Sequence, residues 1–396
     1  MRYIVNLSFW IGIFFSYVCE ASAMVDERQP LCCVRVLLDK HDEGDVELLW
    51  TFAAEHGFVV QDIAGKRRKE EMGCAELRVA IRGGMLWLNG HRVLTRNVQI
   101  EVKDGGHLFF QGNEYQGSFY ILYRDKVWYL VNRVGLEEYV CSVLRSEGWP
   151  GWHRELEVNK LLAITIRSYV TATMLESRRR GRRSKPEMYD VCSSNIHQTY
   201  RGTHSIIKLR EAVEATCSIV SVYKGKPIKA MYDICCGGVI PAHMTGVDFT
   251  AAPYLARNYA CSSCVVCKAY SWEVIYTGAE VQALLGLTGV SAALSSVRIT
   301  RTDKAGIVQQ VVFKFGKRVV KLSGKKVYAL FKDIKSGVFT VSLEKNGVRF
   351  RGRGFGHHMG LCQWGAREMI RSGMSYIEVL SFFYPGSQVQ RIEIVT

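Results

Sequence analysis

The feature that most constrains the fold is a change in hydrophobic period near Gly135. Before it, short runs rich in β-branched, leucine and aromatic residues alternate with turn signals, which predicts β-strands. After it, apolar residues recur every three or four positions, which predicts helices. We therefore expect an α+β protein with a strand-rich part at 24–132, and a part at 133–396 that starts with a central helical pair and ends as a mixed α/β region with a glycine-rich loop.

Four runs in the first part are predicted as strands, and one dipeptide predicts a hairpin. Asn89-Gly90 favours a two-residue turn, because both residue types accept a positive φ. One helix is expected near 46–56. The predicted strands are 34–38, 77–81, 85–88 and 127–131.

Two helices are predicted on either side of Pro150, which cannot continue a helix. Their apolar stripes run through Leu136 to Val143 and Leu161 to Met174, and Glu147 lies near the end of the first. A basic loop at 176–187 is expected to follow. Later segments are predicted as strands at 219–223, 228–232, 297–300 and 311–315, as a glycine-rich turn at 352–360, and as helices at 364–370 and 376–383.

The N-terminus predicts export. Arg2 precedes an apolar run at 4–18, and Ala-Ser-Ala at 21–23 has the small-x-small pattern of a signal-peptidase site. Residues 1–23 are therefore predicted to be a signal peptide, with a mature protein in the periplasm or cell envelope. No later run has the ~20 apolar residues that span a bilayer. The mature protein is expected to be peripheral to a membrane at most.

The chain is strongly basic, with 52 Lys and Arg against 37 Asp and Glu and a net charge of +15. Such a charge favours polyanions. For an exported protein, anionic wall polymers or membrane surfaces are better partners than nucleic acid, and we expect no nucleic-acid partner. The basic run at 178–183 is interpreted as a solvated loop, with phosphate-backbone binding as the alternative.

Cysteine is abundant, with 13 residues in the chain and 12 after removal of the signal peptide. An even number in an exported protein predicts disulfides. Cys261, Cys264 and Cys267 have a spacing that resembles half a metal cluster, and the oxidising compartment favours disulfides there as well.

Glu147 stands out as a candidate acid or base, because Trp149, Pro150 and Trp152 follow it. Apolar surroundings favour the protonated form of a carboxyl group, which can then donate its proton. Indole faces also suit the apolar face of a sugar. The alternative is an exposed glutamate at a helix end. The competing carboxyl groups nearby are Glu137, Glu138, Glu155 and Glu157.

Four stretches resemble the SpoIID/LytB family, in the family's order. The first is 136–150, with Ser146-Glu147 before Trp149-Pro150, and the second is 163–169. The third is 189–202, followed by Gly237-Gly238. The strongest is 352–366, which reads Gly-Arg-Gly-Phe-Gly-His and continues to Gln363 and Ala366. The similarity spans about 34–395.

The resemblance implies a function in the cell wall. Several members of this family are lytic transglycosylases that cut peptidoglycan glycan strands, notably strands already stripped of stem peptides, and others are amidase enhancers. The resemblance implies that Glu147 occupies the position of the catalytic glutamate. Arg167 and Tyr169, on the second predicted helix, are expected either to contact glycan oxygens or only to brace Glu147. Lytic transglycosylation needs one carboxyl group and no cofactor. The predicted glycan-binding residues are Trp149, Arg167, Tyr169, Gln198, Tyr200, Arg353, His357 and Gln363.

Two other functions remain open from the sequence. One is a non-catalytic glycan-binding protein that enhances an N-acetylmuramoyl-L-alanine amidase, which is also the partner enzyme that the resemblance implies. The other is a basic polyanion-binding protein.

The sequence contains one candidate zinc site. Cys192 and His197 stand at a spacing found in half of a zinc site. Sporulation members of the family bind zinc there with a Cys and an adjacent His-Cys pair, whereas this chain has Ile196-His197-Gln198. Cys235, Cys236 and His243 are candidates to complete the site, and a disulfide among them is the alternative.

Overall fold

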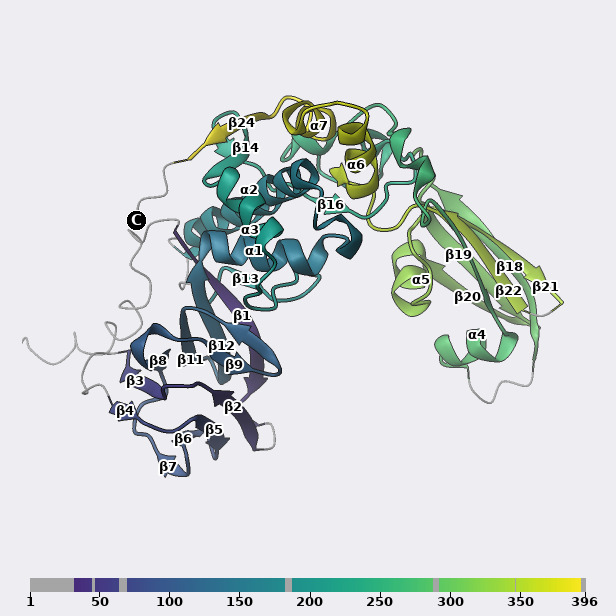
Figure 1. The fold of residues 1–396 in the computed structure, drawn as a ribbon. Coiled ribbons are helices and arrows are strands. Elements are labelled where there is room, and N and C mark those ends of the chain that lie inside the picture. Colours follow the sequence, from purple (N-terminus) through teal and green to yellow (C-terminus); the bar gives the residue numbers. More distant parts are fainter. Residues whose placement is uncertain are drawn as a thin grey trace, which may run out of the picture. The chain divides into compact units, whose positions relative to one another are not determined.

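A computed structural model describes residues 32–44, 47–63, 70–181, 187–287, 292–345 and 347–392. The predicted signal peptide lies outside these residues. The chain forms two compact units, coloured along the sequence in Figure 1: Met1–Glu147 with Thr173–Ile206 and Glu393–Thr396, and Gly148–Ala172 with Ile207–Ile392. Helices and strands are both abundant, and the predicted α+β class is confirmed.

The first unit is built on two antiparallel sheets, to which β13 adds one parallel edge. One has seven strands in the order β13 (Val191–Cys192), β1 (Cys33–Asp42), β12 (Val127–Gly135), β11 (Ser118–Arg124), β8 (Val98–Val102), β3 (Phe58–Asp62) and β4 (Glu70–Met72). The other has six, in the order β10 (Asn113–Tyr115), β9 (Leu108–Phe110), β2 (Leu48–Ala53), β5 (Glu76–Arg82), β6 (Met85–Leu88) and β7 (His91–Arg92).

The strand predictions for this unit are confirmed in β1, β5, β6 and β12. The hairpin is confirmed too: β6 pairs with β7, and Asn89 and Gly90 have φ of 47° and 84°. The helix predicted near 46–56 is wrong, because this segment contains β2. Trp50 and Phe52 are buried while Leu49 is exposed, so the burial period is two and the segment pairs with β5.

Helix α1 (Leu136–Glu147) follows β12 directly, and α2 (Leu156–Gly181) begins after a short 3₁₀ turn, η3 (Pro150–Trp152). The predicted helical pair is confirmed. The predicted start of the basic loop is wrong, because α2 continues to Gly181 and includes Arg178, Arg179 and Arg180. Arginine is a good helix former, and Arg180 pairs with Glu176 at 3.7 Å, one turn earlier. Residues 182–186 are outside the described part.

The described residues of the second unit form four small sheets. The strand predicted at 228–232 is wrong, because β15 ends at Pro227 and the next strand starts at Tyr232. The other strand and helix predictions for this unit are confirmed. Its strands are β15 (Lys226–Pro227), β14 (Ile219–Tyr223) and β24 (Gln388–Arg391); β16 (Tyr232–Asp233) and β23 (Leu361–Cys362); β17 (Ser271–Tyr276), β22 (Gly347–Arg353) and β21 (Phe339–Glu344); and β18 (Leu294–Thr302), β19 (Val308–Phe315) and β20 (Arg318–Ser323). Its helices, besides the first part of α2, are α3 (Ile207–Ala215), α4 (Gly278–Leu284), α5 (Gly324–Leu330), α6 (Gln363–Arg371) and α7 (Tyr376–Phe383).

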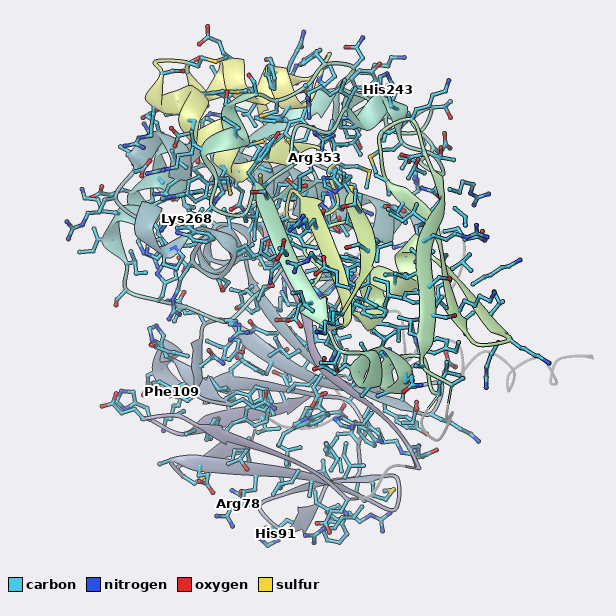
Figure 2. All side chains as sticks on the ribbon, turned by 90° about the vertical axis from the view of Figure 1, so that its right-hand side faces the viewer. Arg78, His91, Phe109, His243, Lys268 and Arg353 are labelled. Atoms are coloured by element: carbon cyan, nitrogen blue, oxygen red, sulfur yellow. The ribbon has the colours of Figure 1, made fainter. Side chains whose placement is uncertain are left out.

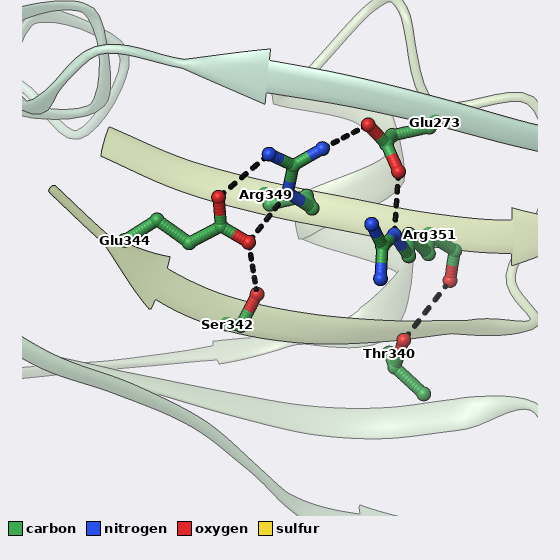
Figure 3. Close-up of polar contacts among 6 residues, drawn as sticks. All are labelled: Glu273, Thr340, Ser342, Glu344, Arg349 and Arg351. Carbon is green, nitrogen blue, oxygen red and sulfur yellow. Dashed lines mark hydrogen bonds and ion pairs between the residues drawn. The ribbon is translucent and has the colours of Figure 1, made fainter. Parts of the chain in front are cut away.

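The β17–β22–β21 sheet carries a charged ladder on its exposed face (Figure 3). Arg349 donates to Glu344 from Nε at 2.5 Å and also contacts Glu273, which Arg351 reaches at 2.5 Å. The pKa of Glu273 is lowered, first by its hydrogen bond with Arg351, and that of Glu344 by Arg349. On the other side, Phe313, Phe331 and Phe350 belong to a closed apolar core.

Among the described residues, no helix combines the length and apolar character that crossing a membrane requires.

Candidate functional site

Glu147 is the last residue of α1 and is half-buried. Its Oε1 accepts a hydrogen bond from the backbone N–H of Thr199 at 2.5 Å. This donor comes from a segment 52 residues further along the chain, so the carboxylate is held by tertiary structure. A backbone donor orients one carboxylate oxygen with little freedom, which suits a group that must meet a particular atom of a substrate.

The segment that carries Thr199 is fastened to its surroundings on both sides. Gln198 accepts from the Tyr139 hydroxyl at 3.1 Å, and the Tyr200 hydroxyl donates to Asn132 at 2.7 Å. The rings of Tyr139 and Tyr200 stack with centroids 5.4 Å apart. Burial raises the pKa of Tyr200 well above its ordinary value, so this hydroxyl stays a donor. The two tyrosines therefore fix the backbone that positions Glu147.

The second unit contains a cluster of three indole rings. Trp364 lies edge-to-face with Trp152 at 5.1 Å and with Trp149 at 5.8 Å between centroids. The Arg367 guanidinium lies 4.9 Å from the centre of the Trp152 ring and pairs with Glu155 at 2.6 Å. Trp152 is buried, whereas Trp149 is 40% exposed. The Trp149 indole is therefore partly exposed to solvent and packs against Trp364. The Glu155–Arg367 ion pair supports the buried Trp152 ring.

The glycine-rich turn packs against β16 and the Cys235-Cys236 segment that follows it. Gly356 has φ of 130°, and a Cβ there would lie 2.4 Å from the Asp233 side chain. The His358 N–H donates to Asp233 at 2.7 Å, and His358 Nδ1 bonds to the Cys236 carbonyl oxygen at 2.9 Å. Burial lowers the pKa of His358 and raises that of Asp233 well above its usual range. The turn is therefore tightly fitted, and glycine is required where the chain touches Asp233.

The predicted glycan-binding residues divide by exposure. Trp149, Arg353 and His357 are exposed; Arg353, labelled in Figure 2, ends β22. Five others are buried and pack against neighbouring residues. Arg167, for example, is fully buried and donates to the carbonyl oxygens of Ile219 and Val213. The buried residues are Arg167, Tyr169, Gln198, Tyr200 and Gln363.

The arrangement of the cysteines differs from the disulfides that the sequence predicts. The structure contains no disulfide among the cysteines of its described residues, so the expected disulfides are not found. Cys192 Sγ and His197 Nδ1 are 3.1 Å apart, but the described residues add no third metal-ligating side chain to this pair. A group of four forms instead in the second unit: Cys236, Cys261, Cys264 and Cys362.

The sequence alone did not predict two features: the full membership of the indole cluster and the backbone donor to Glu147. Trp364 and Arg367 complete the indole cluster, and their sequence signal was only the helical period of 364–370. The Thr199 backbone donor has no sequence signal at all, because any residue but proline supplies an N–H.

Comparison with known proteins supports the resemblance to the SpoIID/LytB family. The family model for stage II sporulation protein matches residues 124–223, which contain α1, all of α2 and Thr199. An uncharacterised protein of Brachyspira hyodysenteriae is 28% identical over 77% of this chain and 79% of its own length. Stage II sporulation protein D of Bacillus subtilis is 27% identical over 66% of this chain and 76% of its own length. An amidase enhancer of Bacillus subtilis is 38% identical over 53 residues, which are 13% of this chain and 8% of that protein.

Together, these matches support a role related to the cell wall. These matches support the SpoIID/LytB family, which the motifs around Glu147 and the glycine-rich turn predicted.

Proposed function

We propose that this protein cleaves the glycan strands of peptidoglycan by lytic transglycosylation, with Glu147 as both acid and base. The observation that carries the proposal is the half-buried carboxylate at the end of α1, oriented by the Thr199 N–H. The family match supports the same residue, since the matched region includes it.

The reaction has two proton transfers through one carboxyl group. Protonated Glu147 donates to the oxygen that bridges MurNAc C1 and GlcNAc C4, and the C1–O bond breaks. The resulting carboxylate then removes the proton from the C6 hydroxyl of the same MurNAc as that oxygen bonds to C1. The products are a 1,6-anhydro-MurNAc end and a free GlcNAc 4-hydroxyl. Water is not consumed, so no second carboxyl group is needed.

The exposed groups of the second unit are proposed to bind the glycan. Trp149 follows Glu147 by two positions and offers an indole face, which packs well against the C–H face of a sugar. Arg353 and His357 offer charged and polar groups on the glycine-rich turn. We also propose that the protein is exported, that it acts in the periplasm or cell envelope, and that it prefers strands without stem peptides.

Mass spectrometry of the products tests this proposal. Purified peptidoglycan, either intact or first treated with an amidase to remove stem peptides, is incubated with the protein. Anhydro-ended fragments that increase with time are the expected result, with more from the stripped glycan. Fragments with reducing MurNAc ends would mean hydrolysis, and would contradict the role of the C6 hydroxyl.

A second function is favoured by the short match to an amidase enhancer. In that case the protein holds glycan and increases the activity of an N-acetylmuramoyl-L-alanine amidase, its proposed partner. Release of stem peptides by the amidase, measured with and without this protein, tests it. A rise that persists in Glu147→Gln, with no anhydro product from the wild type, would favour enhancement over cleavage.

A further inference from the structure

We propose that Cys236, Cys261, Cys264 and Cys362 bind one structural zinc ion as four thiolates. This site is separate from the Cys192–His197 pair and from Glu147. It goes beyond the proposed function, because it concerns what holds the second unit together.

The sulfur positions fit a tetrahedral zinc site. The four Sγ atoms all lie within 4.8 Å of one another, and those of Cys236 and Cys264 are 3.8 Å apart. A zinc–sulfur distance of about 2.3 Å in a tetrahedron separates the sulfurs by about 3.8 Å. A disulfide needs about 2.05 Å between two sulfurs and leaves no reason for four to converge. The arrangement is therefore that of a metal site and not of two crossing disulfides.

The surroundings of the sulfurs suit thiolates. Cys362 Sγ accepts N–H groups from Cys236 at 3.2 Å and from Gly365 at 3.3 Å. Backbone donors aimed at a sulfur stabilise its negative charge and orient it, as the outer partners of metal ligands do. All four cysteines are at most 1% exposed. Buried thiolates need a compensating cation, and a zinc ion supplies it.

Helix α6 makes room for the sulfurs at one residue. A Cβ on Gly365 would lie 2.5 Å from Cys261 Sγ and 3.3 Å from Cys362 Sγ. Gly365 is within the helix and has no positive φ, so backbone conformation does not require glycine here. Glycine is required at this position because the first turn of α6 packs directly against the sulfur atoms of Cys261 and Cys362.

The ligands come from three separate segments. Cys236 follows β16, Cys261 and Cys264 flank the start of the 3₁₀ turn η6 (Ser263–Val266), and Cys362 ends β23 and caps α6. Cys261 and Cys264 have the C-x2-C spacing that zinc sites commonly use. A bound zinc ion would therefore hold α6, with Trp364 and Arg367, in place beside the glycine-rich turn.

Elemental analysis of the purified protein tests the proposal. The full chain, prepared under reducing conditions with no added metal, is expected to contain one zinc per chain by mass spectrometry of the elements. Cys261→Ser and Cys362→Ser are expected to lower zinc content at least about tenfold, as loss of a thiolate ligand does. Cys267→Ser is the matched control: it is a buried cysteine of the same segment outside the group of four, and zinc should stay at one per chain.

A second measurement on the wild type covers the case in which the serine variants do not fold. Zinc removal by a chelator under mild denaturation should make four more thiols reactive toward a thiol reagent, with one zinc released for four thiols. Absence of metal together with non-reactive cysteines would mean disulfides and overturn the proposal, and so would iron with acid-labile sulfide in place of zinc. Neither result depends on glycan cleavage, so failure here and failure of the proposed function are separate outcomes.

Discussion

Replacing Glu147 with glutamine should abolish glycan cleavage while leaving the fold nearly unchanged. The Gln carbonyl oxygen can accept the Thr199 N–H in place of the carboxylate oxygen, and this contact also dictates which way the amide points. The exchange of a charged acceptor for a neutral one should cost about 1 kcal/mol of folding stability. The amide has no proton to give the bridging oxygen, so cleavage should fall by about 10²-fold to 10⁴-fold, or roughly 2.7 to 5.4 kcal/mol in the activation barrier.

The assay is the time course of anhydro-ended fragments from stripped glycan, with thermal unfolding and glycan pull-down as checks on fold and binding. Glu138→Gln is the matched control, because it removes the same charge from the same helix about 14 Å away along its axis. Glu155→Gln is not suitable, since Glu155 pairs with Arg367 beneath the indoles. If Glu147→Gln produces anhydro ends within about threefold of the wild type, acid–base catalysis by Glu147 is refuted.

Three further outcomes are expected. Trp149→Ala should weaken binding to stripped glycan by roughly fivefold to tenfold in a sedimentation assay, with an unchanged unfolding temperature, because the lost indole is partly exposed. Gly365→Ala should destabilise the protein by about 1 to 3 kcal/mol in denaturant titration and lower its zinc content, because the new methyl group collides with Cys261 Sγ; an unchanged zinc content would argue against close approach. The pKa of Glu273 and Glu344 is lowered from 4.5 in the folded protein, so the stability from their arginine contacts should be present above that value and disappear as pH falls through the lowered pKa. Denaturant titrations from about pH 7 to about pH 3 should show a smaller acid loss in Arg349→Met than in the wild type.

Much of the local structure could be predicted because local patterns decide it. The period change at Gly135, the Asn89-Gly90 turn and Pro150 each act over a few residues, and the structure has a strand end, a hairpin and a helix break there. The helix prediction for 46–56 is wrong because the apolar residues there fit both the helical and the strand period. Pairing of β2 with β5 selects the strand. The boundary between the two compact units could not be predicted from local patterns. It falls after Glu147 and not at the change of hydrophobic period near Gly135, because contacts between residues distant in sequence define the units.

The site was predictable only in part. Glu147 was identified by its neighbours and by family motifs, but its orienting partner is a backbone N–H that leaves no trace in side-chain identity. Several polar residues of the motifs are buried and hydrogen-bonded within the fold, as Gln198 and Tyr200 are, and residue type alone does not predict such burial. The four cysteines were visible in the sequence, whereas their convergence is a property of three-dimensional structure: Cys236 and Cys362 are 126 residues apart.

The Glu155–Arg367 ion pair determines how late during synthesis the indole cluster can be completed. Glu155 and Arg367 are 212 residues apart, so the ion pair that supports Trp152 closes a very long loop. Contacts of such sequence separation form late, because loop closure must precede them. Chains emerge from the ribosome N-terminus first, so α1 is complete long before α6 exists. A nascent chain that ends before α6 would therefore contain α1 and Trp152 but not the Glu155–Arg367 ion pair, and the cluster of three indoles can form only after Trp364 and Arg367 have been synthesised.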